Sequence, residues 1–149
     1  MWTDAILAYL HFAAIFTLIW FLAKEWTLLR AGFSSDGLER LARADAGFGI
    51  AAGLVLVTGA LRAVFGVKGW AFYAHNPAFH VKIGLFVVVG LISIAPTLQF
   101  LRWRKALRNN AAFRVRETDW TRARRLVLIE LHILALIPLA AVIMSRGLG

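Results

Sequence analysis

Four long apolar runs separated by more polar connections dominate the chain, and this pattern predicts its fold. The runs cover residues 5–23, 46–63, 79–101 and 126–144. Each has close to the roughly 20 mostly apolar residues that a membrane-spanning helix requires. The first run lacks a preceding basic segment and a small-residue cleavage site, which indicates a retained span rather than a signal peptide. We therefore predict an all-α transmembrane four-helix bundle in which residues 1–149 form a single domain.

Polar residues at the edges of the runs predict where the helices begin. Thr3 or Asp4 can cap the first helix, and Asp45 lies at the start of the second. Asn76 followed by Pro77 predicts an N-cap with proline at the first position of the third helix. This last boundary is the best defined of the three.

Glycine and proline predict local features of the helices. The spacing of Gly49 and Gly53 permits close approach of another helix, within the bundle or at the seam of a homodimer. Pro96 and Pro138 each remove an intrahelical hydrogen bond, so we expect kinks there. The connection 102–125 is long and partly amphipathic, which predicts a short interfacial helix.

Composition and charge indicate how the chain sits in a membrane. It is 60% hydrophobic with a net charge of +9, and its basic residues lie in the connections. This distribution favours contact with the lipid bilayer over nucleic-acid binding. The second connection holds only Lys68, whereas the third holds Arg102, Arg104, Lys105, Arg108, Arg114, Arg116, Arg122, Arg124 and Arg125. The positive-inside rule then places both termini on the outer (periplasmic) side of a bacterial inner membrane.

Ionisable side chains inside the apolar runs are the main functional signal. A charge at the bilayer centre costs about 2.5–3.5 kcal/mol on insertion scales, so such groups usually face the bundle interior. His11, Leu18 and Glu25 lie at heptad spacing and should share one inward face. His80 and Lys82 lie about 200° apart on a helix, so they cannot both face one partner. Lys82 could also extend to the membrane surface.

Several cationic and aromatic residues are expected near the outer surface: Arg62, Trp70, Tyr73, His75, His80 and Lys82. Such a cluster suits a porphyrin, because the propionates of a porphyrin need cationic partners and its ring packs on apolar or aromatic side chains. Neutral histidine is the commonest haem-iron ligand, so His11 and His80 are the candidate metal ligands, although an interhelical hydrogen bond would also explain His11. The candidate cofactor-binding residues are His11, His80, Lys82, Arg62, Trp70, Tyr73 and, for a second porphyrin, His132. The aromatic residues also suit an ordinary interfacial belt. The absence of cysteine excludes thioether-linked haem and cysteine-ligated iron–sulfur clusters.

Glu130 lies in the inner half of the fourth run, where two interpretations remain open. With Glu25 or Asp45 it could carry protons. The candidate catalytic residues are therefore Glu130, for this role, and Lys82, as a possible counter-ion or ligand. Alternatively, it could form a purely structural ion pair with Arg43, Arg124 or Arg125.

Two stretches resemble known membrane families. Leu10-His11 and the segment Phe79-His80-Val81-Lys82-Ile83-Gly84-Leu85 are similar to the HemJ-type protoporphyrinogen oxidases. That resemblance implies a haem-b-containing bundle in which His11 and Lys82 are important positions. The fourth run departs from the family pattern, because Ile129-Glu130-Leu131-His132 stands where Asn-Glu-x-Pro is expected.

A closer similarity is to a bacterial family of four-span membrane proteins of undefined function. It is carried by Trp70, Tyr73, His75-Asn76, Phe79 and Lys82, and by the ending Ile137-Pro138-Leu139.

The first hypothesis is therefore a membrane b-type haem protein that acts in electron transfer or porphyrinogen oxidation, with a porphyrin or quinone-like redox partner. The second is a small membrane transporter or assembly subunit for a metal ion or partner protein, which would use the same buried polar residues. A visible haem spectrum would separate the two.

Overall fold

The structure is a computed structural model that describes residues 2–66 and 69–146. Its secondary structure there is entirely helical, and four of the helices are long and apolar enough to cross a membrane. This confirms the all-α class and the four membrane-spanning helices. The elements in chain order are α1 (Trp2–Arg30), α2 (Ser35–Phe65), α3 (Gly69–Ala74), α4 (Pro77–Asn109) and α5 (Glu117–Ser145).

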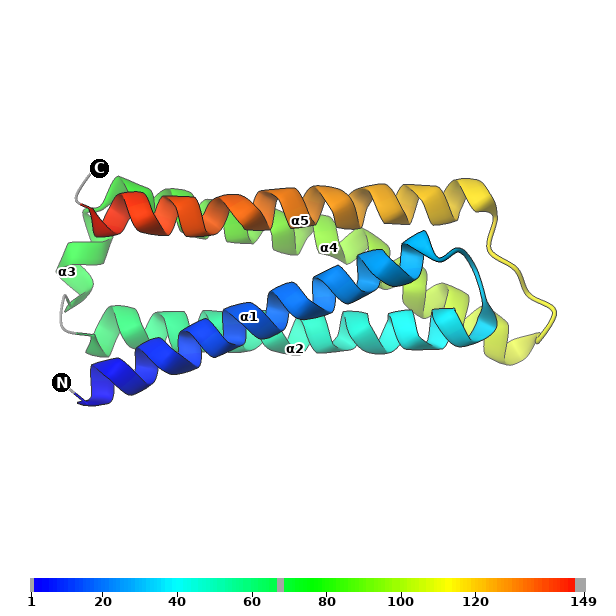
Figure 1. The fold of residues 1–149 in the computed structure, drawn as a ribbon, viewed down its shortest axis with the longest axis horizontal. Coiled ribbons are helices and arrows are strands. Elements are labelled where there is room, and N and C mark those ends of the chain that lie inside the picture. Colours follow the sequence, from blue (N-terminus) through cyan, green and yellow to red (C-terminus); the bar gives the residue numbers. More distant parts are fainter. Residues whose placement is uncertain (1, 67–68, 147–149) are drawn as a thin grey trace.

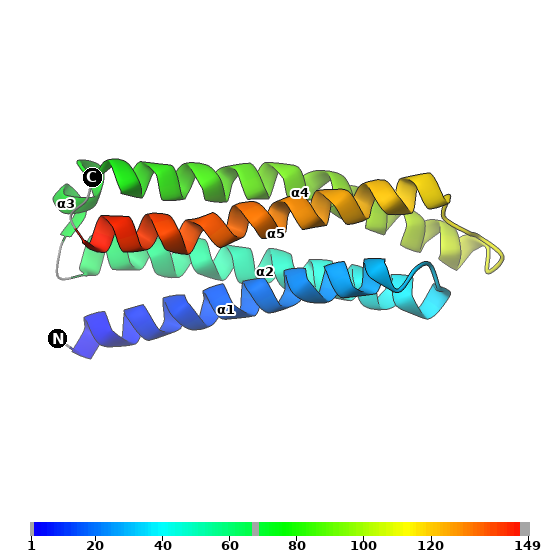
Figure 2. The same ribbon diagram turned by 45° about the horizontal axis from the view of Figure 1, so that its top comes forward.

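The four long helices run up and down as two neighbouring hairpins. α1 packs most extensively on α2, and α4 on α5, while smaller α1–α5 and α2–α4 contacts close the ring. Both termini and α3 lie at one end, which we call the terminal end (Figure 1). The α1–α2 and α4–α5 connections lie at the opposite end, which we call the loop end, and a second view shows the same arrangement (Figure 2).

The long helices extend past the apolar runs at the loop end, and this corrects two expectations. The connection 102–125 holds no separate interfacial helix, because α4 continues to Asn109 and α5 begins at Glu117. Asp45 lies well inside α2, whose N-cap is Ser34: the Ser34 hydroxyl accepts a 2.9 Å hydrogen bond from the Gly37 N–H. The 31 residues of α2 measure about 46 Å, against a hydrocarbon core of about 30 Å.

At the terminal end the helix starts agree only in part with expectation. The Asn76 side chain accepts from the backbone N–H groups of Ala78 and Phe79, at 2.9 and 3.3 Å, which confirms the predicted cap of α4. α1 already begins at Trp2, so its predicted capping residues lie within the first turn. The short helix α3 was not predicted. α4 continues as a single helix through Pro96, and α5 does so through Pro138.

Close helix packing uses different glycines from those predicted. Gly49 and Gly53 are exposed, and nothing lies within 4 Å of a Cβ placed on either, so within this chain the predicted close approach is wrong. Instead, the Phe21 ring of α1 occupies the space beside Gly47. The His11 ring similarly covers Gly59, with its Cε1 3.2 Å from where a Cβ would stand. These two glycines let α1 approach α2.

The bundle is packed most tightly toward the loop end. Leu22, Leu29, Leu38, Leu41 and Phe100 have no exposed surface there. Aromatic rings on α4 and α5 close this end of the bundle, because Trp103 and Trp120 stack with ring centroids 5.8 Å apart. Buried apolar area of this kind stabilises the helix pairing and fixes the facing registers.

Candidate functional site

Two groups of polar side chains lie between the helices, one toward each end, and in them His11 and the three carboxyl groups are buried whereas Arg62 and Lys82 are partly exposed. The terminal-end cluster consists of His11 of α1, Arg62 of α2 and Lys82 of α4. The carboxylate cluster, toward the loop end, consists of Glu25 of α1, Asp45 of α2 and Glu130 of α5. The buried positions of His11 and Glu25 confirm the inward face that the heptad spacing predicted.

His11 is fixed by a side-chain hydrogen bond to the neighbouring helix. Its Nδ1 lies 2.9 Å from the Thr58 hydroxyl oxygen, and the ring is only 4% exposed. The Thr58 hydroxyl donates its single proton to the Leu54 carbonyl, at 2.6 Å. In that arrangement the hydroxyl accepts at the other contact, which corresponds to the tautomer with the proton on Nδ1 of His11. The lone pair of the neutral ring is then on Nε2, which is the arrangement that a metal-ligating histidine needs.

Two cations lie within electrostatic range of this histidine. Lys82 and Arg62 both act on the His11 ring, and Arg62 also acts on Lys82. The Arg62 guanidinium lies over the Phe12 ring at 5.9 Å, and its Nε is buried without a hydrogen-bond partner among residues 2–66 and 69–146. A cluster of two cations and one neutral histidine is suited to an anionic group.

The other predicted binding residues lie outside this cluster. His80 is exposed, and its Nε2 is 2.9 Å from the Ala74 carbonyl, so Lys82 is the one of this pair that faces the bundle. Trp70 is 59% exposed on α3, and the side chain of Tyr73 lies outside the described residues. His132 is exposed, with Nδ1 2.7 Å from the Leu128 carbonyl, so it points away from both clusters.

The carboxylate cluster joins three helices without an ion pair. Glu25 lies within electrostatic range of Asp45 and Glu130, and Asp45 within range of Glu130. Both Glu25 and Glu130 have a buried Oε1 atom, and neither atom has a hydrogen-bond partner in the described part of the chain. The expected structural pairing of Glu130 with arginine is therefore wrong. The ion pairs that the structure shows use the acids Asp36, Glu39 and Asp119.

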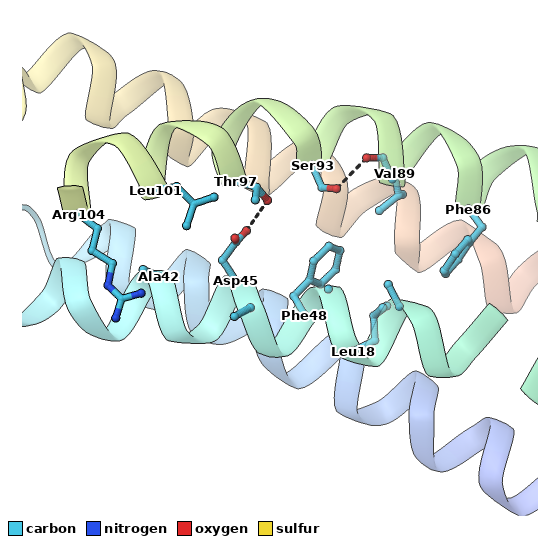
Figure 3. A pocket seen from close by; sticks show the side chains of 14 residues that line it. Leu18, Ala42, Asp45, Phe48, Phe86, Val89, Ser93, Thr97, Leu101 and Arg104 are labelled. Atoms are coloured by element: carbon cyan, nitrogen blue, oxygen red, sulfur yellow. Dashed lines mark hydrogen bonds between the residues drawn. The ribbon is translucent and has the colours of Figure 1, made fainter. Parts of the chain in front are cut away.

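A pocket of about 320 Å³ opens between α2 and α4 beside this cluster. Asp45 and Thr97 point toward each other across it, and the Thr97 hydroxyl donates a 2.7 Å hydrogen bond to Asp45 Oδ1 (Figure 3). Arg104 lines the same pocket, and its Nε bonds Glu39 at 2.9 Å. Apolar and small side chains form most of the wall, and none of the histidines contributes to it. The pocket therefore belongs with the carboxylates rather than with His11.

Sequence reasoning missed the two threonines that organise these clusters. Thr58 and Thr97 each hydrogen-bond an ionisable side chain on another helix. The contact of the His11 ring with Gly59, three residues before Arg62, was also not predicted. The role of Asp45 in a buried cluster was foreseen only as a partner of Glu130.

Four apolar helices that enclose buried ionisable side chains define a multi-pass membrane protein. The chain belongs to the family described as "Predicted membrane protein (DUF2214)", whose family model matches residues 3–149. This confirms the similarity to a membrane-protein family of undefined function. No curated protein and no solved structure matches the chain.

Proposed function

We propose that the protein is a b-type haem protein of the bacterial inner membrane, in which His11 is an axial ligand, and that it acts in electron transfer or porphyrinogen oxidation. One observation carries the proposal: a buried histidine whose Nδ1 lies 2.9 Å from the Thr58 hydroxyl oxygen, a contact that in the Nδ1–H tautomer would leave the Nε2 lone pair for a metal ion. Such an outer hydrogen bond orients the ring and sets the tautomer in metal-ligating histidines.

The neighbouring residues fit the rest of the group. The porphyrin carries carboxylate side chains, and Arg62 of α2 and Lys82 of α4 supply cations near His11. The unpartnered Nε of Arg62 is a donor that an incoming carboxylate would satisfy. Gly59 lets the imidazole lie flat against α2, because a side chain there would meet the ring. When bound, haem supplies one-electron redox chemistry.

The test is the visible spectrum and haem content of the purified, detergent-solubilised protein. We expect a Soret band in the wild type and its loss or shift in His11→Ala, because no other histidine among the described residues is buried. His132→Ala is the matched control, since that ring is exposed and bonded to its own helix, and it should leave the spectrum unchanged. Lys82→Met should retain the band and weaken haem binding.

Wild-type protein from haem-replete cells that shows no Soret band would overturn the proposal. An unchanged spectrum in folded His11→Ala would remove His11 from the ligand set. The first result would favour the alternative, a small transporter or assembly subunit for a metal ion or partner protein. Three His, Asp or Glu side chains close enough to hold a bare metal ion are not found in the described part of the chain.

A further inference from the structure

We propose that Glu25, Asp45 and Glu130 form a proton-exchange site, buried toward the loop end and open to the pocket between α2 and α4. The site is separate from the terminal-end cluster and does not depend on haem. It would give the protein a function in proton transfer between the bundle interior and one membrane surface.

The first step is the absence of compensating charge. Glu25 and Glu130 are each 1% exposed, and each has a buried carboxyl oxygen without a hydrogen-bond partner in the described parts of the chain. An isolated ionised carboxylate taken out of water costs several kcal/mol even after relaxation. A bound proton removes that charge and turns one oxygen into a donor. The burial of these two side chains therefore favours the protonated form of each.

The second step is that the three carboxyl groups act on one another. The ionisable groups that face the cluster are Glu25 from α1, Asp45 from α2 and Glu130 from α5. From α4 come the Thr97 hydroxyl and Arg104, whose Nε is already bonded to Glu39. Because ionising one carboxyl raises the cost of ionising the next, the group loses its protons in successive coupled steps.

The third step is the route to water. Asp45 is the member that lines the pocket, and its Oδ1 accepts from Thr97, which holds the carboxyl at the pocket wall (Figure 3). In the exchange, an O–H bond of Glu25 or Glu130 breaks and one forms on ionised Asp45, with the proton passing through water between the carboxyl groups. The Asp45 carboxyl then transfers that proton to water, which leaves as hydronium. Charge balances at each transfer, and no oxidant or reductant is needed.

Infrared spectroscopy of the full-length protein in detergent tests this site, because a protonated carboxylic acid has its own carbonyl band, which shifts in D₂O. We expect this band at neutral pH and its partial loss in Glu25→Gln and in Glu130→Gln. Glutamine resembles the neutral acid, so both variants should stay folded. Glu117→Gln is the matched control, since this exposed residue at the start of α5 should contribute nothing to the band.

Asp45→Asn tests the route. It should keep the band of the two glutamic acids but slow its shift in D₂O, because the exchanging group is gone. Absence of the band in folded wild type, or a band unaffected by both glutamine variants, would overturn the site. Unchanged exchange in Asp45→Asn would overturn the role of Asp45. If Na⁺ or K⁺ abolishes the band at fixed pH, the cluster binds a cation and the proton assignment is wrong. A missing Soret band would leave all these results unaffected.

Discussion

Single hydrogen bonds decide what the buried polar residues can do. His11 and Asp45 each hydrogen-bond a threonine on another helix. Thr58 can accept from the histidine while its own proton goes to the Leu54 carbonyl, whereas Thr97 donates to the carboxyl. A threonine hydroxyl thus positions the neutral imidazole of His11 at one end of the bundle and the carboxyl group of Asp45 toward the other.

Thr58→Val should reveal the bond to His11. Removing the hydroxyl leaves a buried ring N–H without a partner, which costs about 1–3 kcal/mol, so we expect a lower melting temperature. If His11 ligates haem as proposed, the midpoint potential should rise, because the lost bond would have made the imidazole more basic and favoured oxidised iron. Spectroelectrochemistry measures this change.

Thr17→Val is the matched control for that substitution. Thr17 makes the same hydroxyl-to-carbonyl bond, to Ala13 at 2.8 Å, but it is exposed. Both its melting temperature and the midpoint potential should stay near wild type. Equal effects of the two valine variants would show that the bond to His11 is not what Thr58 contributes.

At the scale of the helix, Trp120 joins α5 to the end of α1. Its indole N–H donates a 2.8 Å hydrogen bond to the Leu29 carbonyl, in the last turn of α1, where carbonyls lack helical partners. Trp120→Phe keeps an aromatic ring against Trp103 and loses the donor. We expect a loss of about 1 kcal/mol in unfolding free energy, measured by thermal or denaturant unfolding. Trp20→Phe, at an exposed position, should cost less, and the reverse order would contradict this role.

Hydropathy located the four helices because each contains an apolar stretch of spanning length, but it could not place their ends at the loop end. There the flanks are charged, while the buried side still follows the helical period, as Leu38 and Leu41 do in α2. Trp120, Ala123 and Val127 continue the same period into the start of α5. A search for amphipathic spacing in the charged flanks would therefore have found these extensions.

The candidate site was predictable only along one helix at a time. Heptad spacing placed His11 and Glu25 on the inward face of α1 because that relation depends on helix geometry alone. The partners Thr58 and Thr97 lie 47 and 52 residues from the groups they bind. Such contacts depend on the relative register of packed helices, which no local pattern in a single sequence specifies.

For the whole molecule, the two clusters lie toward opposite ends of one bundle. The histidine and its two cations are at the terminal end, and the carboxylates are nearer the loop end. The basic residues of the α4–α5 connection and its flanking turns are mostly exposed at the loop end, where they suit anionic lipid headgroups. The positive-inside rule predicts that this end is cytoplasmic, and the proposed haem-binding side would then be periplasmic.

This orientation can be tested with single cysteines, because the chain contains none. Ala71 of α3 and Ala112 of the α4–α5 connection are both exposed, at the terminal and loop ends respectively. Ala71→Cys should react with a membrane-impermeant thiol reagent in intact spheroplasts, whereas Ala112→Cys should react only after the membrane is opened. Because the two substitutions are chemically identical, a difference in labelling reports the side of the membrane rather than thiol reactivity. The opposite pattern would place His11 near the cytoplasm and the carboxylate cluster near the periplasm, and so reverse the direction in which Asp45 exchanges protons.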